Sequence, residues 1–180
     1  VGMNPSRIAL LNKLMEMGGN IQVFNHSSFG KEPIADLNIK SSVLIPCEVT
    51  PGDVANLIDE LPILFVASCF AEGTSSFTNI QELKHKESDR LKAMQNGLNK
   101  MKIKNFLDGN VFYIEGMGQD YKSPNFIAQT NFDHRIAMSF AIAGLNSVSS
   151  IEIASPECIN TSFPEFIELG KKLGCNFEIS

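Results

Sequence analysis

The segments DELPILFVASCFA, residues 59–71, and DHRIAMSFAIAGL, residues 133–145, decide the fold of this chain. Each begins with an aspartate and continues as an apolar run that is long enough for a helix and too short for a membrane span. Because such a helix is apolar on nearly all sides, it must be buried among other elements. The two segments therefore predict two buried helices.

These helices belong to an internal repeat. Asp59 and Asp133 are 74 positions apart, and so are the pairs Ser75-Ser76 and Ser149-Ser150, each of which precedes a short apolar segment. Alternation of helix and strand at a fixed spacing predicts a βα unit that is used at least twice, with each unit needing its neighbours to bury its apolar helix.

Amphipathic helices, each leading into a strand, are expected between and around the buried ones. Three such pairs are predicted, at residues 5–17 and 21–24, 91–101 and 111–114, and 166–173 and 177–179. Segments rich in turn-forming residues, 25–33 and 116–125, predict loops. The expected fold is one α/β domain with buried helices inside and sheets outside.

Composition limits the class of protein. The 180 residues are 43% hydrophobic, and 15 basic against 20 acidic residues give a net charge of -5, which argues against nucleic acid or an anionic membrane as a partner. The four cysteines show no CxxC pairing. Reduced thiols that pack as small hydrophobic groups, in a cytoplasmic protein, are the simplest interpretation.

Three junctions place polar side chains at expected helix starts: Lys84 to Arg90 (KHKESDR), Asn131 to Arg135 (NFDHR), and Asp59 to Pro62 (DELP). Free N–H groups and the positive end of the helix dipole favour phosphate or carboxylate ligands at such positions. For each junction alone, a solvated charge run or a capping aspartate is an equally good interpretation. Because the internal repeat relates the helices, we expect all three junctions on one rim.

Two of these junctions resemble a known family. KESDR, residues 86–90, and DHRIAM, residues 133–138, are similar to signature segments of the enolpyruvylshikimate-phosphate synthases. The resemblance extends from Asn4-Pro5-Ser6-Arg7 to Thr161-Ser162-Phe163-Pro164. Many members carry a lysine where Thr161 stands here, so the segment looks like the Thr-Ser-Phe-Pro branch, which includes glyphosate-tolerant enzymes.

The resemblance implies an inside-out enolpyruvyl transferase-like fold of βαβαββ repeats, in a transferase that uses no metal or organic cofactor. It implies transfer of the enolpyruvyl (carboxyvinyl) group of phosphoenolpyruvate to the 5-hydroxyl of shikimate 3-phosphate, with release of phosphate, on the route to chorismate and aromatic amino acids. Residues 1–180 would be the C-terminal globular half, without its N-terminal half, and inactive alone.

By the same resemblance, Asp59 and Glu87 are the expected catalytic residues. Asp59 matches the carboxylate that hydrogen-bonds the attacking hydroxyl and can remove its proton. Glu87 matches the acid that protonates the methylene carbon of phosphoenolpyruvate.

The expected substrate-binding residues are Asp59, Lys86, Arg90, His134 and Arg135. Lys86 resembles a contact to shikimate phosphate, and the two arginines resemble the pair that holds phosphoenolpyruvate by its carboxylate and phosphate. His134 either bonds the phosphate or orients its neighbours.

Two alternatives stay open at this stage. A UDP-N-acetylglucosamine enolpyruvyl transferase shares the fold and the donor, although the segments at 86–90 and 133–135 fit the shikimate branch better. A non-catalytic βαβ-repeat module that binds RNA is disfavoured by the net charge of -5.

Overall fold

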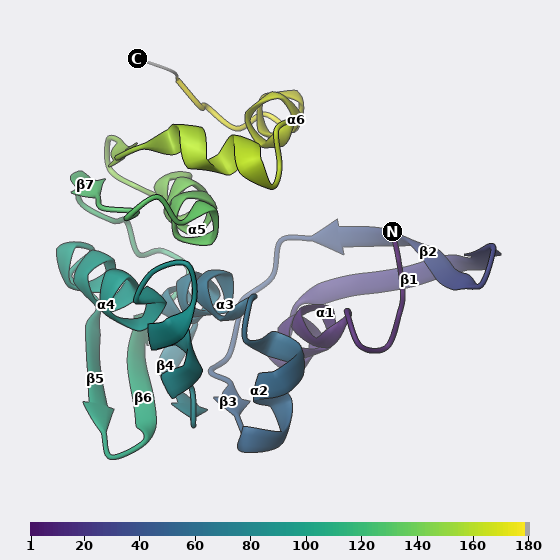
Figure 1. Cartoon of the computed structure of the whole chain (residues 1–180), viewed down its shortest axis with the longest axis horizontal. Helices are drawn as coiled ribbons and strands as arrows, with labels where there is room; N and C mark the ends of the chain where they lie inside the picture. Colours follow the sequence, from purple (N-terminus) through teal and green to yellow (C-terminus); the bar gives the residue numbers. More distant parts are fainter. Residues whose placement is uncertain (179–180) are drawn as a thin grey trace.

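The two predicted buried helices lie side by side at the centre of the molecule, as α3 (Leu61–Cys69) and α5 (His134–Gly144) (Figure 1). This computed structural model describes residues 1–178. Phe65 of α3 and Phe140 of α5 are fully buried. The prediction of two buried apolar helices is confirmed.

One complete βαβαββ unit occupies the middle of the chain. Its elements are β3 (Glu48–Val49), α2 (Pro51–Leu57), α3, β4 (Glu72–Thr78), the 3-10 helix η1 (Gln81–His85), α4 (Arg90–Lys100), β5 (Lys104–Asp108) and β6 (Val111–Met117). The strands form a four-stranded sheet in the order β3-β4-β6-β5, in which β3 and β4 are parallel and the other pairs antiparallel.

Parts of the same unit recur on both sides. Before it, α1 (Ala9–Glu16) leads to the antiparallel strands β1 (Asn20–Phe29) and β2 (Glu32–Lys40), as α4 leads to β5 and β6. After it come β7 (Phe126–Ala128), α5, β8 (Ile151–Ile153), the 3-10 helix η2 (Pro156–Thr161) and α6 (Phe166–Lys172). The parallel pair β7–β8 repeats the pairing of β3 with β4. The structure therefore confirms a repeated α/β unit.

The sheet covers the outside of the buried helix α3 (Figure 1). On its inner face, the rings of Phe77 from β4 and Phe112 from β6 meet Phe65 with ring centroids 4.7 and 5.2 Å apart. Edge-to-face aromatic contacts of this kind stabilise a core beyond the area they bury. The helices thus lie inside and the sheet outside, as the sequence predicts.

The N-terminal elements differ from the prediction in two ways. Residues 25–33 are not a loop, because β1 and β2 form one long hairpin whose turn lies at Gly30, with a register shift between Phe24 and Ser27. The polar residues of this segment suggest a turn, yet their backbone pairs across an exposed ribbon. The first helix begins at Ala9 rather than Pro5, because the Asn4 side chain accepts the Ser6 N–H (3.1 Å) in a separate turn.

Three further segments differ in detail. The predicted loop at 116–125 begins later, because β6 continues to Met117. Of the strand predicted at 177–179, Phe177 and Glu178 have no strand pairing, and Ile179 lies outside the described residues. Ser162 and Glu165, three residues apart, have the sequence pattern of a capping box, but Ser162 does not cap α6, which begins after Glu165 without a side-chain cap. None of the helices formed by residues 1–178 is long and apolar enough to cross a bilayer.

The close packing of α4 on α5 depends on Gly97. A Cβ atom placed there would lie 1.9 Å from Cζ of Phe140, whose ring is buried and packs edge-on against Phe126. We expect Gly97→Ala to destabilise the fold by about 1–3 kcal/mol, since an overpacked core must shift. Gly52→Ala in α2, where the nearest atom is at 3.7 Å, is the matched control and should be neutral or slightly stabilising. Urea unfolding of both variants measures the difference, and equal stability would contradict this packing.

Candidate active site

The candidate site is organised around Arg90, the first residue of α4, whose side chain is completely buried. Its Nε donates to Oδ2 of Asp133 (2.8 Å), its Nη1 to Oδ1 of Asp59 (2.9 Å) and its Nη2 to Oε2 of Glu87 (2.5 Å). Burial by itself would lower the pKa of Arg90, but the three carboxylates raise it above the ordinary value. The guanidinium therefore stays charged and joins three segments of the chain.

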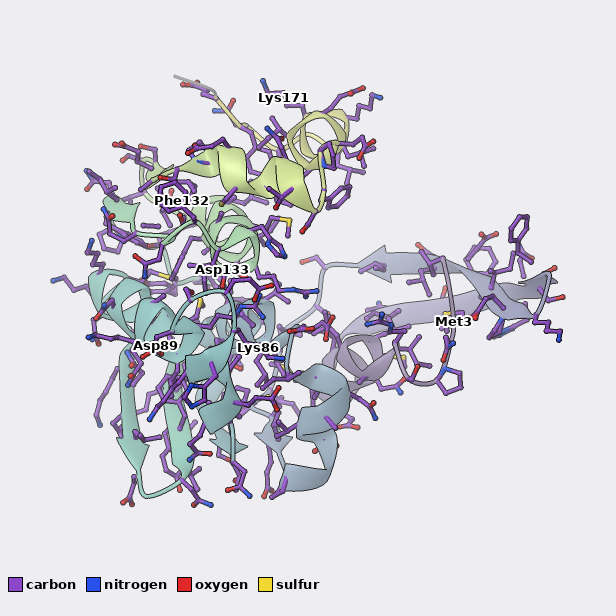
Figure 2. The ribbon with its side chains drawn as sticks, in the orientation of Figure 1. Met3, Lys86, Asp89, Phe132, Asp133 and Lys171 are labelled. Atoms are coloured by element: carbon purple, nitrogen blue, oxygen red, sulfur yellow. The ribbon has the colours of Figure 1, made fainter. Side chains whose placement is uncertain are left out.

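Asp133 fixes this arrangement from the start of α5. Its side chain is fully buried and caps the helix, with Oδ1 accepting the N–H of Arg135 (3.0 Å). Its Oδ2 accepts both Arg90 and the hydroxyl of Ser88 (3.0 Å). One carboxylate thus determines where α5 begins and how Arg90 is oriented. Asp133, at the start of α5, and Lys86, shortly before α4, are labelled in Figure 2.

Asp59, in the connection from α2 to α3, contacts residues of both motifs, 86–90 and 133–138. Its Oδ1 accepts Arg90 and lies 3.6 Å from Nζ of Lys86, which also pairs with Glu82 (2.9 Å). Partial burial alone would raise the pKa of Asp59, but the charges of Arg135, Lys86 and Arg90 outweigh it and lower the pKa below the usual value. The bond to Glu82 is the main cause that raises the pKa of Lys86. Asp59 is therefore a carboxylate, and Lys86 an ammonium, at neutral pH.

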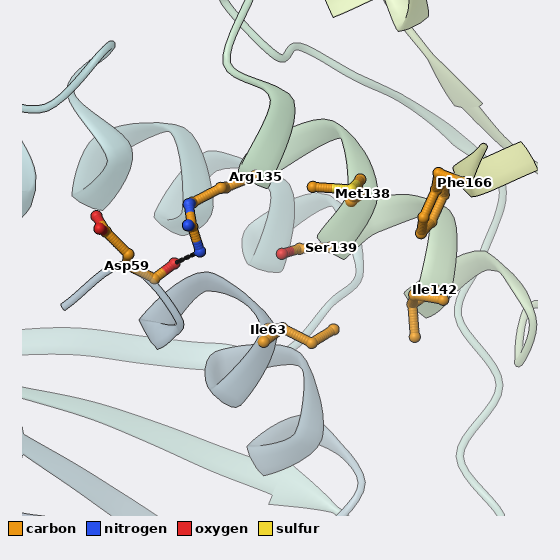
Figure 3. Close-up of a pocket in the computed structure, with 7 residues that line it drawn as sticks. All are labelled: Asp59, Ile63, Arg135, Met138, Ser139, Ile142 and Phe166. Carbon is orange, nitrogen blue, oxygen red and sulfur yellow. Dashed lines mark hydrogen bonds between the residues drawn. The ribbon is translucent and has the colours of Figure 1, made fainter. Parts of the chain in front are cut away.

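Arg135 reaches from α5 back to the start of α3 (Figure 3). Its Nη1 donates to the main-chain oxygen of Asp59 (2.8 Å) and lies 3.4 Å from Oε1 of Glu60. About a third of the Arg135 side chain is exposed, 32%, in contrast to the buried Arg90. The two arginines therefore differ: Arg90 is enclosed by the protein, whereas Arg135 faces a space that solvent can reach.

That space is a pocket of about 190 Å³ whose walls come from α3, α5 and α6 (Figure 3). The polar residues Asp59 and Arg135 stand at one end of it. The other lining residues are Ile63, Met138, Ser139, Ile142 and Phe166. An anion from solvent can therefore reach the Arg135 guanidinium without any helix or strand unfolding.

The structure brings most of the predicted site residues together. Asp59, Lys86, Glu87 and Arg90 are joined by direct contacts, and Arg135 contacts the main chain of Asp59. They come from the N-terminal ends of α3, α4 and α5, so the expectation that these helix starts open onto one rim holds.

His134 is less well placed than these residues. It is the first residue of α5 and is half-buried, and its ring has no hydrogen bond to any residue in the described part of the chain.

Sequence reasoning did not single out Ser88 and Glu60 as site residues. Ser88 bonds Asp133, and Glu60 pairs with Arg135. For Ser88 the signal was its place inside the KESDR motif, but Glu60 had only its position next to Asp59. Asp133 was recognised only as a helix cap, although its full burial gives it the second task of holding Arg90.

The βαβαββ repeat around buried helices, with cations at the helix starts, defines an enolpyruvyl transferase fold. A solved enolpyruvyl transferase from Streptomyces tendae has this fold, with a TM-score of 0.67 over 93% of this chain and 35% of its own, at 18% identity. More specifically, the family model described as EPSP synthase (3-phosphoshikimate 1-carboxyvinyltransferase) matches residues 1–169. The chain belongs to the EPSP synthase family.

Individual relatives agree with this assignment. The 3-phosphoshikimate 1-carboxyvinyltransferase of Zymomonas mobilis is 44% identical over 99% of this chain and 40% of its own length. The corresponding protein of Aquifex aeolicus is 42% identical over 92% of this chain and 38% of its own. A solved EPSP synthase from Acinetobacter baumannii superposes with a TM-score of 0.94 at 39% identity, covering all of this chain and 42% of that one. The chain spans about two fifths of the length of these relatives.

The buried pair of Asp133 and Arg90 gives a stability prediction. Asp133→Asn removes the charge that faces a completely buried guanidinium, and losing one partner of such a pair typically costs about 3–5 kcal/mol. Glu168→Gln, which breaks the exposed pair with Lys172, is the control and should cost less than about 0.5 kcal/mol. Denaturant unfolding measures both, and a small effect of Asp133→Asn would mean that Asp59 and Glu87 suffice for Arg90.

The lowered pKa of Asp59 predicts an acid-sensitive contribution to stability. A carboxylate whose folded pKa lies below its unfolded value of 3.8 stabilises the fold above that value, and this contribution is lost as the pH falls through the folded pKa. Asp59→Asn should therefore flatten part of the fall in stability below about pH 4. Thermal unfolding from pH 6 down to pH 2.5 measures the slope. An unchanged slope would show that the cations around Asp59 do not favour its ionised form.

Proposed function

We propose that the full-length protein containing this chain transfers the enolpyruvyl group of phosphoenolpyruvate to the 5-hydroxyl of shikimate 3-phosphate, releasing phosphate on the route to chorismate and aromatic amino acids. The observation that carries the proposal is the meeting of Asp59, Glu87 and three cations at one rim, in a chain of the EPSP synthase family. The proposal calls for no metal or organic cofactor. Family membership also favours it over a UDP-sugar transferase or a non-catalytic module.

Within that protein, residues 1–180 would form the C-terminal globular half, and the rest of the polypeptide would complete the site. In support, the matched relatives are about two and a half times longer, since the chain covers 40% of the Zymomonas mobilis protein. Arg135 and Lys86 are also partly exposed, at 32% and 22% of their side chains, so ligands can reach both cations. A cytoplasmic location remains a prediction from the sequence.

Asp59 and Glu87 would carry the proton transfers of an addition followed by an elimination. Asp59, kept ionised by its three cationic neighbours, would accept the hydrogen bond of the 5-hydroxyl as its oxygen attacks the central carbon of phosphoenolpyruvate. Glu87, half-exposed at 51%, would give a proton to the methylene carbon. Loss of a methyl proton and of phosphate would then restore the double bond.

The cations would hold the anionic groups of both substrates. Lys86 would contact the phosphate of shikimate 3-phosphate, and Arg135 would bind phosphoenolpyruvate through Nε and Nη2, since only its Nη1 has partners within residues 1–178. Arg90 would join Arg135 only if a ligand replaced Glu87 or Asp59 on its buried guanidinium. His134 would bond the phosphate or orient its neighbours.

We also assign the chain to the Thr-Ser-Phe-Pro branch, which includes glyphosate-tolerant enzymes. Thr161 ends η2 and donates its hydroxyl to the main-chain oxygen of Cys158 (2.7 Å), so no cation stands at this position. Inhibition by glyphosate, compared between the full-length protein and its Thr161→Lys variant, tests the assignment. Equal inhibition of both proteins would show that residue 161 does not set the response to glyphosate.

The decisive experiment measures phosphate release by the full-length protein with both substrates and with each one alone. Release that requires phosphoenolpyruvate and shikimate 3-phosphate together supports the function, and release with a UDP-sugar acceptor would refute it. Residues 1–180 alone should fold but release no phosphate, because the remaining contacts are absent. Mixing residues 1–180 with the remainder of the full-length protein should restore turnover.

Two variants of the full-length protein separate the proposed roles. Glu87→Gln should lower kcat by about 10²–10⁴-fold, because proton donation exists only in the transition state. Arg135→Ala should mainly raise the KM for phosphoenolpyruvate, because the cation binds this substrate before and during the reaction. Steady-state kinetics decide the matter, with Lys172→Ala as a surface control. Normal turnover with poor donor binding in Glu87→Gln would reassign Glu87 to a structural role.

A further inference from the structure

We propose that Glu60 is a specificity-determining residue: a displaceable counter-ion that keeps Arg135 from binding single inorganic anions. This inference rests on the proposed function only in naming phosphate as the anion that the site must release. Its physical basis is the unequal way in which the two arginines of the site are held.

Arg90 is already neutralised by carboxylates of the protein itself. Its donors reach three carboxylates at 2.5 to 2.9 Å, and one of these, Asp133, is itself completely buried. An anion from solvent cannot displace Asp133 without leaving a buried charge unpaired, which is costly. Arg90 is therefore a fixed part of the protein frame.

Arg135 is held much more loosely. Only its Nη1 has hydrogen-bond partners within residues 1–178, and the strong bond goes to a neutral main-chain oxygen, that of Asp59 at 2.8 Å. The charged partner, Oε1 of Glu60, lies at 3.4 Å, longer than an ordinary N–H···O bond. Because about a third of both side chains is exposed, at 32% and 30%, this ion pair is weak and open to solvent.

The remaining donors of Arg135, Nε and Nη2, are left for a ligand. A planar guanidinium binds carboxylate and phosphate groups through two parallel bonds. Any anion that binds there approaches the Glu60 carboxylate and must overcome its repulsion. A small ion such as inorganic phosphate gains little in return, because its few atoms reach few other cations.

A larger substrate has more to gain. A ligand that carries a carboxylate and a phosphate can bind Arg135 with one group while the other group finds donors elsewhere in the completed site. Glu60 therefore selects for ligands with two separated anionic groups and promotes the departure of a single phosphate after reaction. The residue acts on binding only, so it is not placed among the proton-transfer groups.

The test is a titration of the 180-residue chain with inorganic phosphate, followed through the Nε–Hε resonance of Arg135. Glu60→Gln should tighten phosphate binding by about 2- to 5-fold, the effect expected from removing one weak exposed ion pair. Glu152→Gln is the matched control, because it removes the same charge from an exposed position on β8. It should change the affinity less than the Glu60 variant does.

Three results would overturn the proposal: unchanged or weaker phosphate binding in Glu60→Gln, an equal gain in Glu152→Gln, or a titration that leaves the Arg135 resonance unmoved in both proteins. Thermal unfolding of each variant verifies that it is folded. Since the titration needs no turnover, its outcome is independent of the proposed reaction. In the active full-length protein, Glu60→Gln should also show stronger product inhibition by phosphate.

Discussion

The ion pair between Arg90 and Asp133 is the constraint on which the rest of the structure depends. Both side chains are completely buried, and their polar atoms lie 2.8 Å apart. Two charges in such surroundings are tolerated only when each is satisfied by the other and by further hydrogen bonds. Arg90 meets this demand with Asp59 and Glu87, and Asp133 meets it with Ser88 and the start of α5. The polar site follows from this requirement.

The buried pair also helps to fix the charge states of the groups around it. Cations near Asp59 favour its carboxylate form, and carboxylates around Arg90 favour its guanidinium form. Charge is thus balanced inside the protein, and only the outer groups remain available to ligands. Arg135 and Lys86 are the partly exposed cations of the set, which is why we propose substrate recognition mainly for them.

The sequence predicted those parts of the structure that depend on local pattern. The apolar runs after Asp59 and Asp133 identified the buried helices and the repeat, and the motifs at 86–90 and 133–138 identified the family. Of the hairpin at 20–40, only the strand at 21–24 was predicted. The rest was missed, because each strand pairs with its neighbour rather than with a core and the polar residues resemble those of a turn. The contact of Glu60 with Arg135 joins residues 75 positions apart, so no local pattern reports it. The task of Asp133 likewise becomes visible only when its burial is known.

The link between α4 and α5 also bears on how the chain opens and closes. Proteins built from repeated units often lose their structure unit by unit, because each unit contacts only its neighbours. Here a buried charge on one unit is satisfied by the next, and Phe140 of α5 fits into the space that Gly97 leaves on α4. Neither helix can detach without leaving the buried charge unpaired and the space at Gly97 unfilled. The amides of α4 and α5 should therefore exchange with solvent as one cooperative block, whereas those of the exposed β1–β2 ribbon should exchange through independent, smaller openings.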